Sequence, residues 1–161
     1  MYVFLVFLPL IGSILAGLLS LNNQDRPAEL VTVSGLLLSL LLSILAFAEV
    51  AISGNPITVD IGRWIVSGDF AAHWSLRFDT ITVVMLLVVT GVSSMVHIYS
   101  IGYMSHDNAR ARFMSYLSLF TFAMLMLVTA DNLVQMFFGW EGVGVASYLL
   151  IGFWYKKDSA H

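Results

Sequence analysis

The chain has 161 residues, of which 59% are hydrophobic and only 11% are charged, and its mean hydropathy is +0.89. Soluble domains carry about 25% charged residues, so this composition is typical of a membrane protein. The net charge of −3 comes without a basic stripe, which argues against nucleic-acid binding. The absence of cysteine excludes disulfides and cysteine-ligated iron–sulfur clusters, and the scattered histidines predict no metal site.

Five apolar segments approach the ~20 residues that a helix needs to cross a ~30 Å hydrocarbon core. We expect membrane spans at about 2–21, 30–52, 80–104, 113–130 and 133–155. The first segment has neither the basic start nor the cleavage site of a signal peptide, so we interpret it as a retained span. Pro9 lies inside it and is tolerated if a neighbouring helix satisfies the carbonyl that proline frees. The predicted fold class is an all-α polytopic membrane protein with five transmembrane helices.

The connections between these spans differ in character. Residues 22–29 are predicted to form a short polar turn, and residues 105–112 a polar loop. Asp131 and Asn132 predict a tight turn, so the last two spans should form an antiparallel helical hairpin. The long connection 53–79 alternates polar and apolar residues on both sides of Ser-Gly-Asp, which indicates a β-hairpin.

These segments divide the chain into four parts. Residues 1–52 hold the first two transmembrane helices, 53–79 the loop with the β-hairpin, 80–155 helices three to five, and 156–161 a polar tail. If the N-terminus lies outside, the inner connections and the tail carry five of the seven basic residues. The positive-inside rule therefore predicts an outer N-terminus, an outer hairpin and an inner C-terminus. The inner basic residues are Arg26, Arg110, Arg112, Lys156 and Lys157, and the outer ones are Arg63 and Arg77.

An acidic residue interrupts the last apolar segment, "MFFGWEGVGVASYLLIGFW", which contains no basic residue. Glu141 would lie roughly 12 Å along the helix from Leu133. A charge at the centre of a bilayer costs about 2.5–3.5 kcal/mol on insertion scales, so such residues face a bundle interior or a wet cavity. Burial favours the neutral acid and a nearby cation favours the carboxylate, so Glu141 is a candidate proton carrier. Alternatively, it stays protonated and donates an interhelical hydrogen bond.

The residues around Glu141 allow two readings each. The glycines of "GWEGVG" either permit close helix packing or loosen the backbone so that water can enter. Tyr148 follows Glu141 by nearly two turns and shares its face, and Ser147 precedes Tyr148. Ser147 and Tyr148 are candidate proton-transfer groups that hold water, although Tyr148 could equally be a core aromatic residue.

Further candidates lie in other segments. His97, in the third span, titrates near neutral pH and is a candidate relay or else a satisfied core histidine. Asp79 and Asp131 are expected at the outer boundary and Arg112 at the inner one, as supporting residues or solvated anchors. Trp140, next to Glu141, is a further supporting candidate.

Three stretches carry a family resemblance. "FDTITVVMLLVVTGVSSMVHIYSIGYM", "RFMSYLSLFTFAMLMLVTADN" and "GWEGVGVASYLLIGFW" resemble the N-terminal part of subunit 5 of the proton-translocating NADH:ubiquinone oxidoreductase, respiratory complex I. The similarity extends from the first span to residue 155. The antiporter-like subunits of multisubunit sodium/proton antiporters, and two sister subunits of complex I, are similar to the chain as well.

The resemblance implies roles for specific positions. Glu141 matches the family's glutamate in the fifth helix, which is thought to translocate protons beside a lysine on a later helix. The hairpin at 53–79 is similar to one that contacts neighbouring subunits. Flavin, iron–sulfur clusters and quinone would belong to other subunits, so no cofactor is expected in this chain. The other positions that match family motifs are His97, Asp79, Arg112, Asp131, Ser147 and Tyr148.

The family's members are several times longer than this chain. We therefore expect a truncated product, a split-gene piece or an incompletely represented protein, with the later helices on another chain. Lys156 and Lys157 lie at the inner boundary and cannot replace a lysine in mid-membrane. Expected partners are the lipid bilayer and other membrane subunits of complex I, in a mitochondrial inner or bacterial plasma membrane. A sodium/proton antiporter subunit and a scaffold that only supports assembly are the alternatives.

Overall fold

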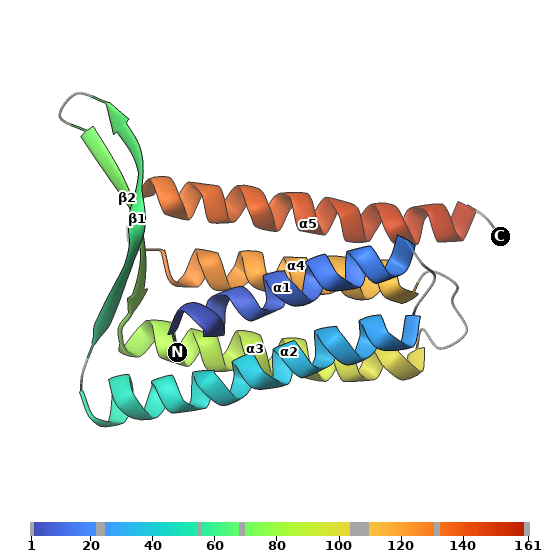
Figure 1. Cartoon of the computed structure of the whole chain (residues 1–161), viewed down its shortest axis with the longest axis horizontal. Helices are drawn as coiled ribbons and strands as arrows, with labels where there is room; N and C mark the ends of the chain where they lie inside the picture. The colour runs from blue at the N-terminus through green and yellow to red at the C-terminus, as the bar shows by residue number, and fades with distance from the viewer. Residues whose placement is uncertain are drawn as a thin grey trace.

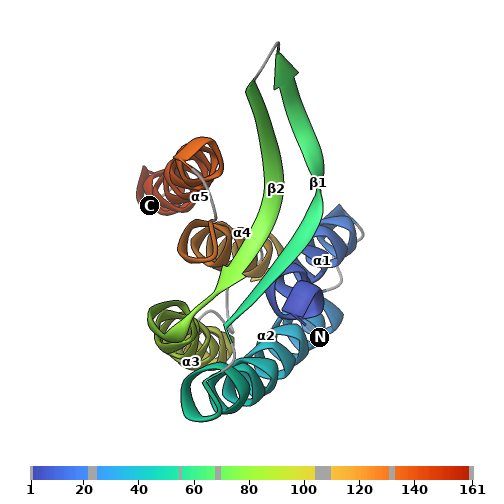
Figure 2. The same cartoon turned by 90° about the vertical axis from the view of Figure 1, so that its left-hand side faces the viewer.

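The computed structural model of the chain describes residues 2–21, 25–54, 56–67, 70–103, 110–130 and 133–159. Its elements are α1 (Tyr2–Leu21), α2 (Asp25–Phe47), the π-helix η1 (Ala48–Ile52), β1 (Ile57–Ser67), β2 (Phe70–Phe78), α3 (Thr80–Tyr103), α4 (Arg110–Val128) and α5 (Leu133–Ser159). The five α-helices lie side by side, and the β-hairpin lies across one end of them (Figure 1). The N-terminus is at the hairpin end and the C-terminus at the other end. Figure 2, which looks onto the hairpin, shows α5 beside α4 and apart from α2 and α3.

The predicted membrane class is confirmed, with corrections to the boundaries. Among the described residues, four helices are long and apolar enough to cross a membrane: Val3–Leu21, Arg26–Ile52, Thr80–Ile101 and Ala111–Val128. The β-hairpin is also confirmed, with β1 and β2 antiparallel from Ile57 opposite Phe78 to Ser67 opposite Phe70.

Two helix starts were predicted too late along the chain. The second helix begins at Asp25 rather than near residue 30, and the fourth at Arg110 rather than near residue 113. Both begin with polar residues, which the hydrophobicity criterion excluded from the spans. Pro27 in the first turn of α2 is well placed, because its missing N–H needs no helical partner there. The predicted turn at Asp131 and Asn132 lies outside the described residues.

Hydroxyl groups join the first four helices. Pro9 frees the carbonyl of Leu5 inside α1, and the Ser39 hydroxyl of α2 donates to that oxygen at 3.0 Å. This confirms the expectation that a neighbouring helix satisfies the freed group. The Ser118 hydroxyl of α4 donates to the Pro9 carbonyl at 2.6 Å. Lipid tails are as apolar as leucine, so such bonds and close packing hold helices together in a bilayer.

The hairpin is fastened to the α4–α5 junction. The side-chain amide of Gln135 accepts a hydrogen bond from the backbone N–H of Ser75 at 3.1 Å and donates to its carbonyl at 2.7 Å. The backbone N–H of Arg77 donates to the carbonyl of Thr129 at 2.9 Å. The last residues of β2 are therefore bonded to β1 on one edge and to the helices on the other. Beneath them Leu76 and Phe78 are fully buried in the main apolar core.

Two glycines bring α5 close to α4. A Cβ added to Gly139 would lie 2.9 Å from the Cα of Leu127, and one added to Gly142 would lie 3.3 Å from the Cβ of Ala123. Ala146, one turn further, is fully buried. These positions lie on one face of α5, so the packing interpretation of the glycines holds for these two. Gly144 meets nothing within 4 Å and belongs to a different face.

Gly139→Ala should loosen the bundle. The new methyl group would collide with the backbone of α4, which cannot move aside as a flexible side chain could. We expect the free energy of unfolding to fall by about 1–3 kcal/mol, the usual cost of overpacking. The matched control is Gly152→Ala in the same helix, where a Cβ meets nothing within 4 Å. Reversible unfolding in mixed micelles, followed by circular dichroism, measures both; equal stabilities would contradict the close contact.

Asp79 forms the N-cap of α3. Its Oδ1 accepts a hydrogen bond from the backbone N–H of Thr82 at 2.9 Å, and its Oδ2 lies 3.5 Å from the Nε of Arg77. The hydrogen bond from Thr82 is the main reason that the pKa of Asp79 lies below its ordinary value of 3.8, and the Arg77 charge adds to it. Asp79 thus connects the end of β2 to the start of α3.

Asp79→Ala should destabilise the chain in a pH-dependent way. Because folding lowers the pKa of Asp79, its stabilising contribution is complete well above pH 3.8 and is lost as the pH falls through the lowered value. We expect the variant to be less stable by about 1 kcal/mol at neutral pH, the usual worth of an N-cap. The difference between wild type and variant should shrink below pH 3.8. Denaturation midpoints across this range test it, and a constant difference would contradict the linkage.

Candidate functional site

The packing of α5 leaves Glu141 outside the contact between α5 and α4. Since Gly139 and Gly142 turn toward α4, Glu141 and Trp140 are exposed, and so is Tyr148, at 76%. A groove of about 290 Å³ runs along this face, lined by Trp140, Glu141, Gly144, Val145 and Tyr148. The predicted common face of Glu141 and Tyr148 is therefore confirmed. Within the described chain Tyr148 packs into no core, and its proton-transfer role stays a prediction.

Glu141 also borders a second, larger groove. This groove has a volume of about 440 Å³ and lies between α1, α4 and α5. Its lining is apolar apart from the acid and includes Phe7, Leu10, Phe122, Met126 and Phe138. Glu141 thus lies between an apolar groove and the groove that Tyr148 lines.

Glu141, expected to face a bundle interior or a wet cavity, does not face the interior of these helices and lines two grooves instead. The inward face of α5 is occupied by small residues that allow close approach to α4, and no room for a carboxyl group remains there. Ser147 is half-buried and does not line the groove of Glu141. Arg112 is exposed near the start of α4, and Asp131 lies outside the described residues.

His97 is buried in α3, away from the groove of Glu141. Its Nδ1 lies 2.7 Å from the backbone oxygen of Ser93. A carbonyl oxygen only accepts, so Nδ1 carries the hydrogen and donates it, and Nε2 of the neutral ring is the acceptor. The Ser93 hydroxyl in turn bonds that of Thr121, which donates to the carbonyl of Leu117. His97 is therefore connected to α4, but the structure does not bring it together with Glu141.

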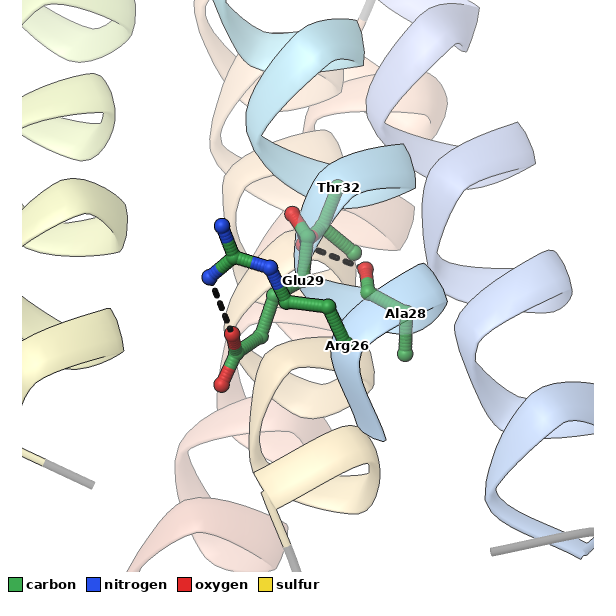
Figure 3. Close-up of polar contacts among 4 residues, drawn as sticks. All are labelled: Arg26, Ala28, Glu29 and Thr32. Carbon is green, nitrogen blue, oxygen red and sulfur yellow. Dashed lines mark hydrogen bonds and ion pairs between the residues drawn. The ribbon is translucent and has the colours of Figure 1, made fainter. Parts of the chain in front are cut away.

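Sequence reasoning missed a second acid, which lies at the end of the bundle away from the hairpin. Glu29 is 1% exposed within α2, and its carboxylate lies 3.7 Å from Nη1 of Arg26 (Figure 3). The hydroxyl of Thr32, one turn further, donates to the carbonyl of Ala28 at 3.0 Å. Assigning residues 22–29 to a turn hid this position. Pro27 as a helix-start residue, and Arg26 and Glu29 at helical spacing, were the signals that could have revealed it.

No metal centre arises from the described residues. In the described ranges, no three histidine, cysteine, aspartate or glutamate side chains gather closely enough to hold an ion. What the site offers is a single carboxyl group on an exposed helix face, with a phenol on the same face. Such an arrangement can accept and release a proton, provided that water or another polar group reaches it.

Comparison with known proteins agrees with the resemblance seen in the sequence. The family model described as "NADH-Ubiquinone oxidoreductase (complex I), chain 5 N-terminus" matches residues 64–114. A second model, "NADH:quinone oxidoreductase/Mrp antiporter, TM", matches residues 130–161. The second match includes Glu141 and both of the glycines that contact α4.

Relatives that align with the whole chain are named as subunits of the same enzyme complex. NADH-ubiquinone oxidoreductase chain 5 of Talaromyces marneffei is 50% identical over 100% of this chain, and that of Marchantia polymorpha is 52% identical over the same share. NADH-quinone oxidoreductase subunit L of Rickettsia felis is 49% identical over 99% of it. The chain spans only about a quarter of each relative, 24% or 25% of its length. It belongs to the family of complex I chain 5 and its bacterial counterpart, subunit L, and corresponds to the N-terminal part of that family.

Proposed function

We propose that this chain forms part of a membrane-arm subunit of respiratory complex I and takes part in proton translocation coupled to NADH oxidation and quinone reduction. The observation that carries the proposal is Glu141, an exposed acid in the mostly apolar middle of α5, in a chain of this family. Translocation needs a group that binds and releases protons inside the membrane. Glu141 is the proposed group.

The proposal also gives the open face an occupant. A carboxyl group in the middle of a membrane helix does not face lipid tails, because the cost of a charge there is several kcal/mol. The relatives are about four times as long as this chain. Their later helices would cover this face and bring the lysine that pairs with Glu141. That pairing is the reason Glu141 would change its proton occupancy as the charge beside it changes.

Other residues have supporting roles in the proposal. Tyr148 shares the groove of Glu141 and would hold water there, with Ser147 behind it. His97 would act as a separate protonatable group in α3, reached through water. Trp140 lines the groove beside the acid, whereas Asp79 and Arg112 lie near opposite ends of the helices and anchor them. We propose no cofactor for this chain, since electron transfer would take place in other subunits.

Five membrane spans and an outer hairpin complete the proposed topology. The fifth span is α5, and the N-terminus and hairpin share one end of the helices (Figure 1). The excess of basic residues at the opposite end favours placing that end inside. The partners would be the lipid bilayer and neighbouring membrane subunits. The membrane is the mitochondrial inner membrane or a bacterial plasma membrane.

A cation/proton antiporter subunit is the second candidate function. The model that matches residues 130–161 names the Mrp antiporter together with NADH:quinone oxidoreductase. An antiporter subunit would show transport that depends on sodium and would have no quinone reductase partner. A pure scaffold would tolerate loss of the carboxyl group at Glu141.

Glu141→Gln tests the proposed proton group. The amide keeps the size and hydrogen-bonding capacity of the acid but cannot release a proton at physiological pH. In membranes that contain the assembled complex, proton transport driven by NADH should fall to near background while the assembled amount stays the same. A pH-sensitive dye in closed vesicles measures transport, and native electrophoresis measures assembly.

The matched control is Glu49→Gln, which makes the same chemical change at an exposed acid in η1. This variant should pump normally. Normal pumping by an assembled Glu141→Gln complex would rule out the proton role and favour the scaffold. Sodium-dependent transport without any quinone reductase activity would favour the antiporter.

A further inference from the structure

The interface between α2 and α3 contains a row of buried polar side chains, here called the seam: Ser43 of α2 and Thr90, Ser94 and His97 of α3. One hydrogen-bond acceptor in this row has no donor among the described residues. Thr90 of α3 and Ser43 of α2 face each other, with their hydroxyl oxygens 3.3 Å apart. Ser94 lies four residues after Thr90, and His97 lies seven residues after Thr90. All three therefore lie on the same side of α3. All three are buried, with His97 at 0% exposure and Ser94 at 3%. This side of α3 is therefore a continuous polar surface inside an apolar bundle.

The opposite side of the seam continues along α2. The two helices are antiparallel, because α2 runs toward the hairpin and α3 runs away from it (Figure 1). One turn from the Thr90–Ser43 contact, this antiparallel register leads us to infer that Ser39, which precedes Ser43 by four residues, lies opposite Ser94. Ser39 is fully buried and donates its hydroxyl hydrogen to the Leu5 carbonyl, so its oxygen can still accept a hydrogen bond.

Two polar atoms of this seam lack partners among the described residues. They are Nε2 of His97 and Oγ of Ser94. The hydrogen bond from Nδ1 to the Ser93 carbonyl, at 2.7 Å, fixes Nε2 as an acceptor that needs a donor. The Ser94 hydroxyl can donate and accept. Leaving such groups buried and unsatisfied is destabilising, because each has lost its hydrogen bonds to water without gaining a replacement.

We propose that the α2–α3 seam holds an internal water molecule bound by His97 Nε2, Ser94 and Ser39. The water donates one hydrogen to Nε2 and one to the oxygen of Ser39, and it accepts the hydroxyl hydrogen of Ser94. Three hydrogen bonds are the usual number for a buried water, and satisfying otherwise unpaired atoms is its usual role. The small side chains of Ser39 and Ser94 leave more space between the helices than leucines would.

The site differs from the proposed proton group in place and in consequence. It belongs to α2 and α3, whereas Glu141 lies on the far side of α4, and it follows from hydrogen bonding whether or not Glu141 carries protons. Its effect is to give His97 bonded partners at both nitrogens. The ring then keeps one tautomer and one orientation, and a proton arriving at the water would reach Nε2 without rotation of the ring.

Solid-state NMR of the full chain in lipid bilayers, with ¹⁵N-labelled histidine, tests the site directly. In the wild type at neutral pH we expect a neutral His97 ring with its hydrogen on Nδ1, and magnetisation transfer between Nε2 and a slowly exchanging water. A ring with its hydrogen on Nε2, or an Nε2 without any water contact, would overturn the proposal.

Variants localise the water. Ser94→Val fills the space and removes the donor, so the water transfer to Nε2 should disappear while the Nδ1 hydrogen bond remains. Ser94→Ala keeps the space and should retain the transfer with faster water exchange. Ser118→Ala, which removes a buried hydroxyl of α4 that already has a partner, should leave the transfer unchanged. Transfer that persists in Ser94→Val would overturn the assignment, and should that variant fail to fold, the wild-type and Ser94→Ala spectra still decide.

Discussion

The contact of Gly139 with Leu127 fixes the direction in which the candidate site points. Helices α4 and α5 approach so closely that a single methyl group would lie 2.9 Å from the opposing Cα. That approach requires the small residues of α5 to face α4. Because successive residues of a helix are rotated by about 100°, Glu141 is then directed away from the bundle. The exposure of the acid is thus a consequence of packing elsewhere on the same helix.

Polar groups hold the other helices in place. In water the apolar side chains would drive the association, but a bilayer offers them an equally apolar environment. Specificity must come from groups that lipid cannot satisfy. The Leu5 carbonyl freed by Pro9 is one such group, and Ser39 meets it. The hairpin is attached in the same way, since Gln135 satisfies both backbone groups of Ser75.

Much of this arrangement could be predicted from the sequence. Apolar length predicted the helices, and alternation predicted the hairpin, because these patterns follow directly from the helix and strand periods. The starts of α2 and α4 could not be found by hydrophobicity, since their first turns are polar and lie at the ends of the bundle. Glu29 was missed for that reason, although helical spacing from Arg26 was present in the sequence.

The direction of Glu141 was harder to predict, because it depends on which of three glycines meets a neighbour. Gly139 and Gly142 do, whereas Gly144 does not. The sequence alone does not distinguish these positions, since each glycine is compatible with close packing. The carboxyl group and the hydroxyl of Tyr148 then share one face of α5. A charged carboxylate on that face would be unfavourable in contact with lipid tails. The relatives are about four times as long as this chain, and the proposed function has their later helices pack on that face. The five helices therefore orient the acid, and what lies across the groove would decide its charge.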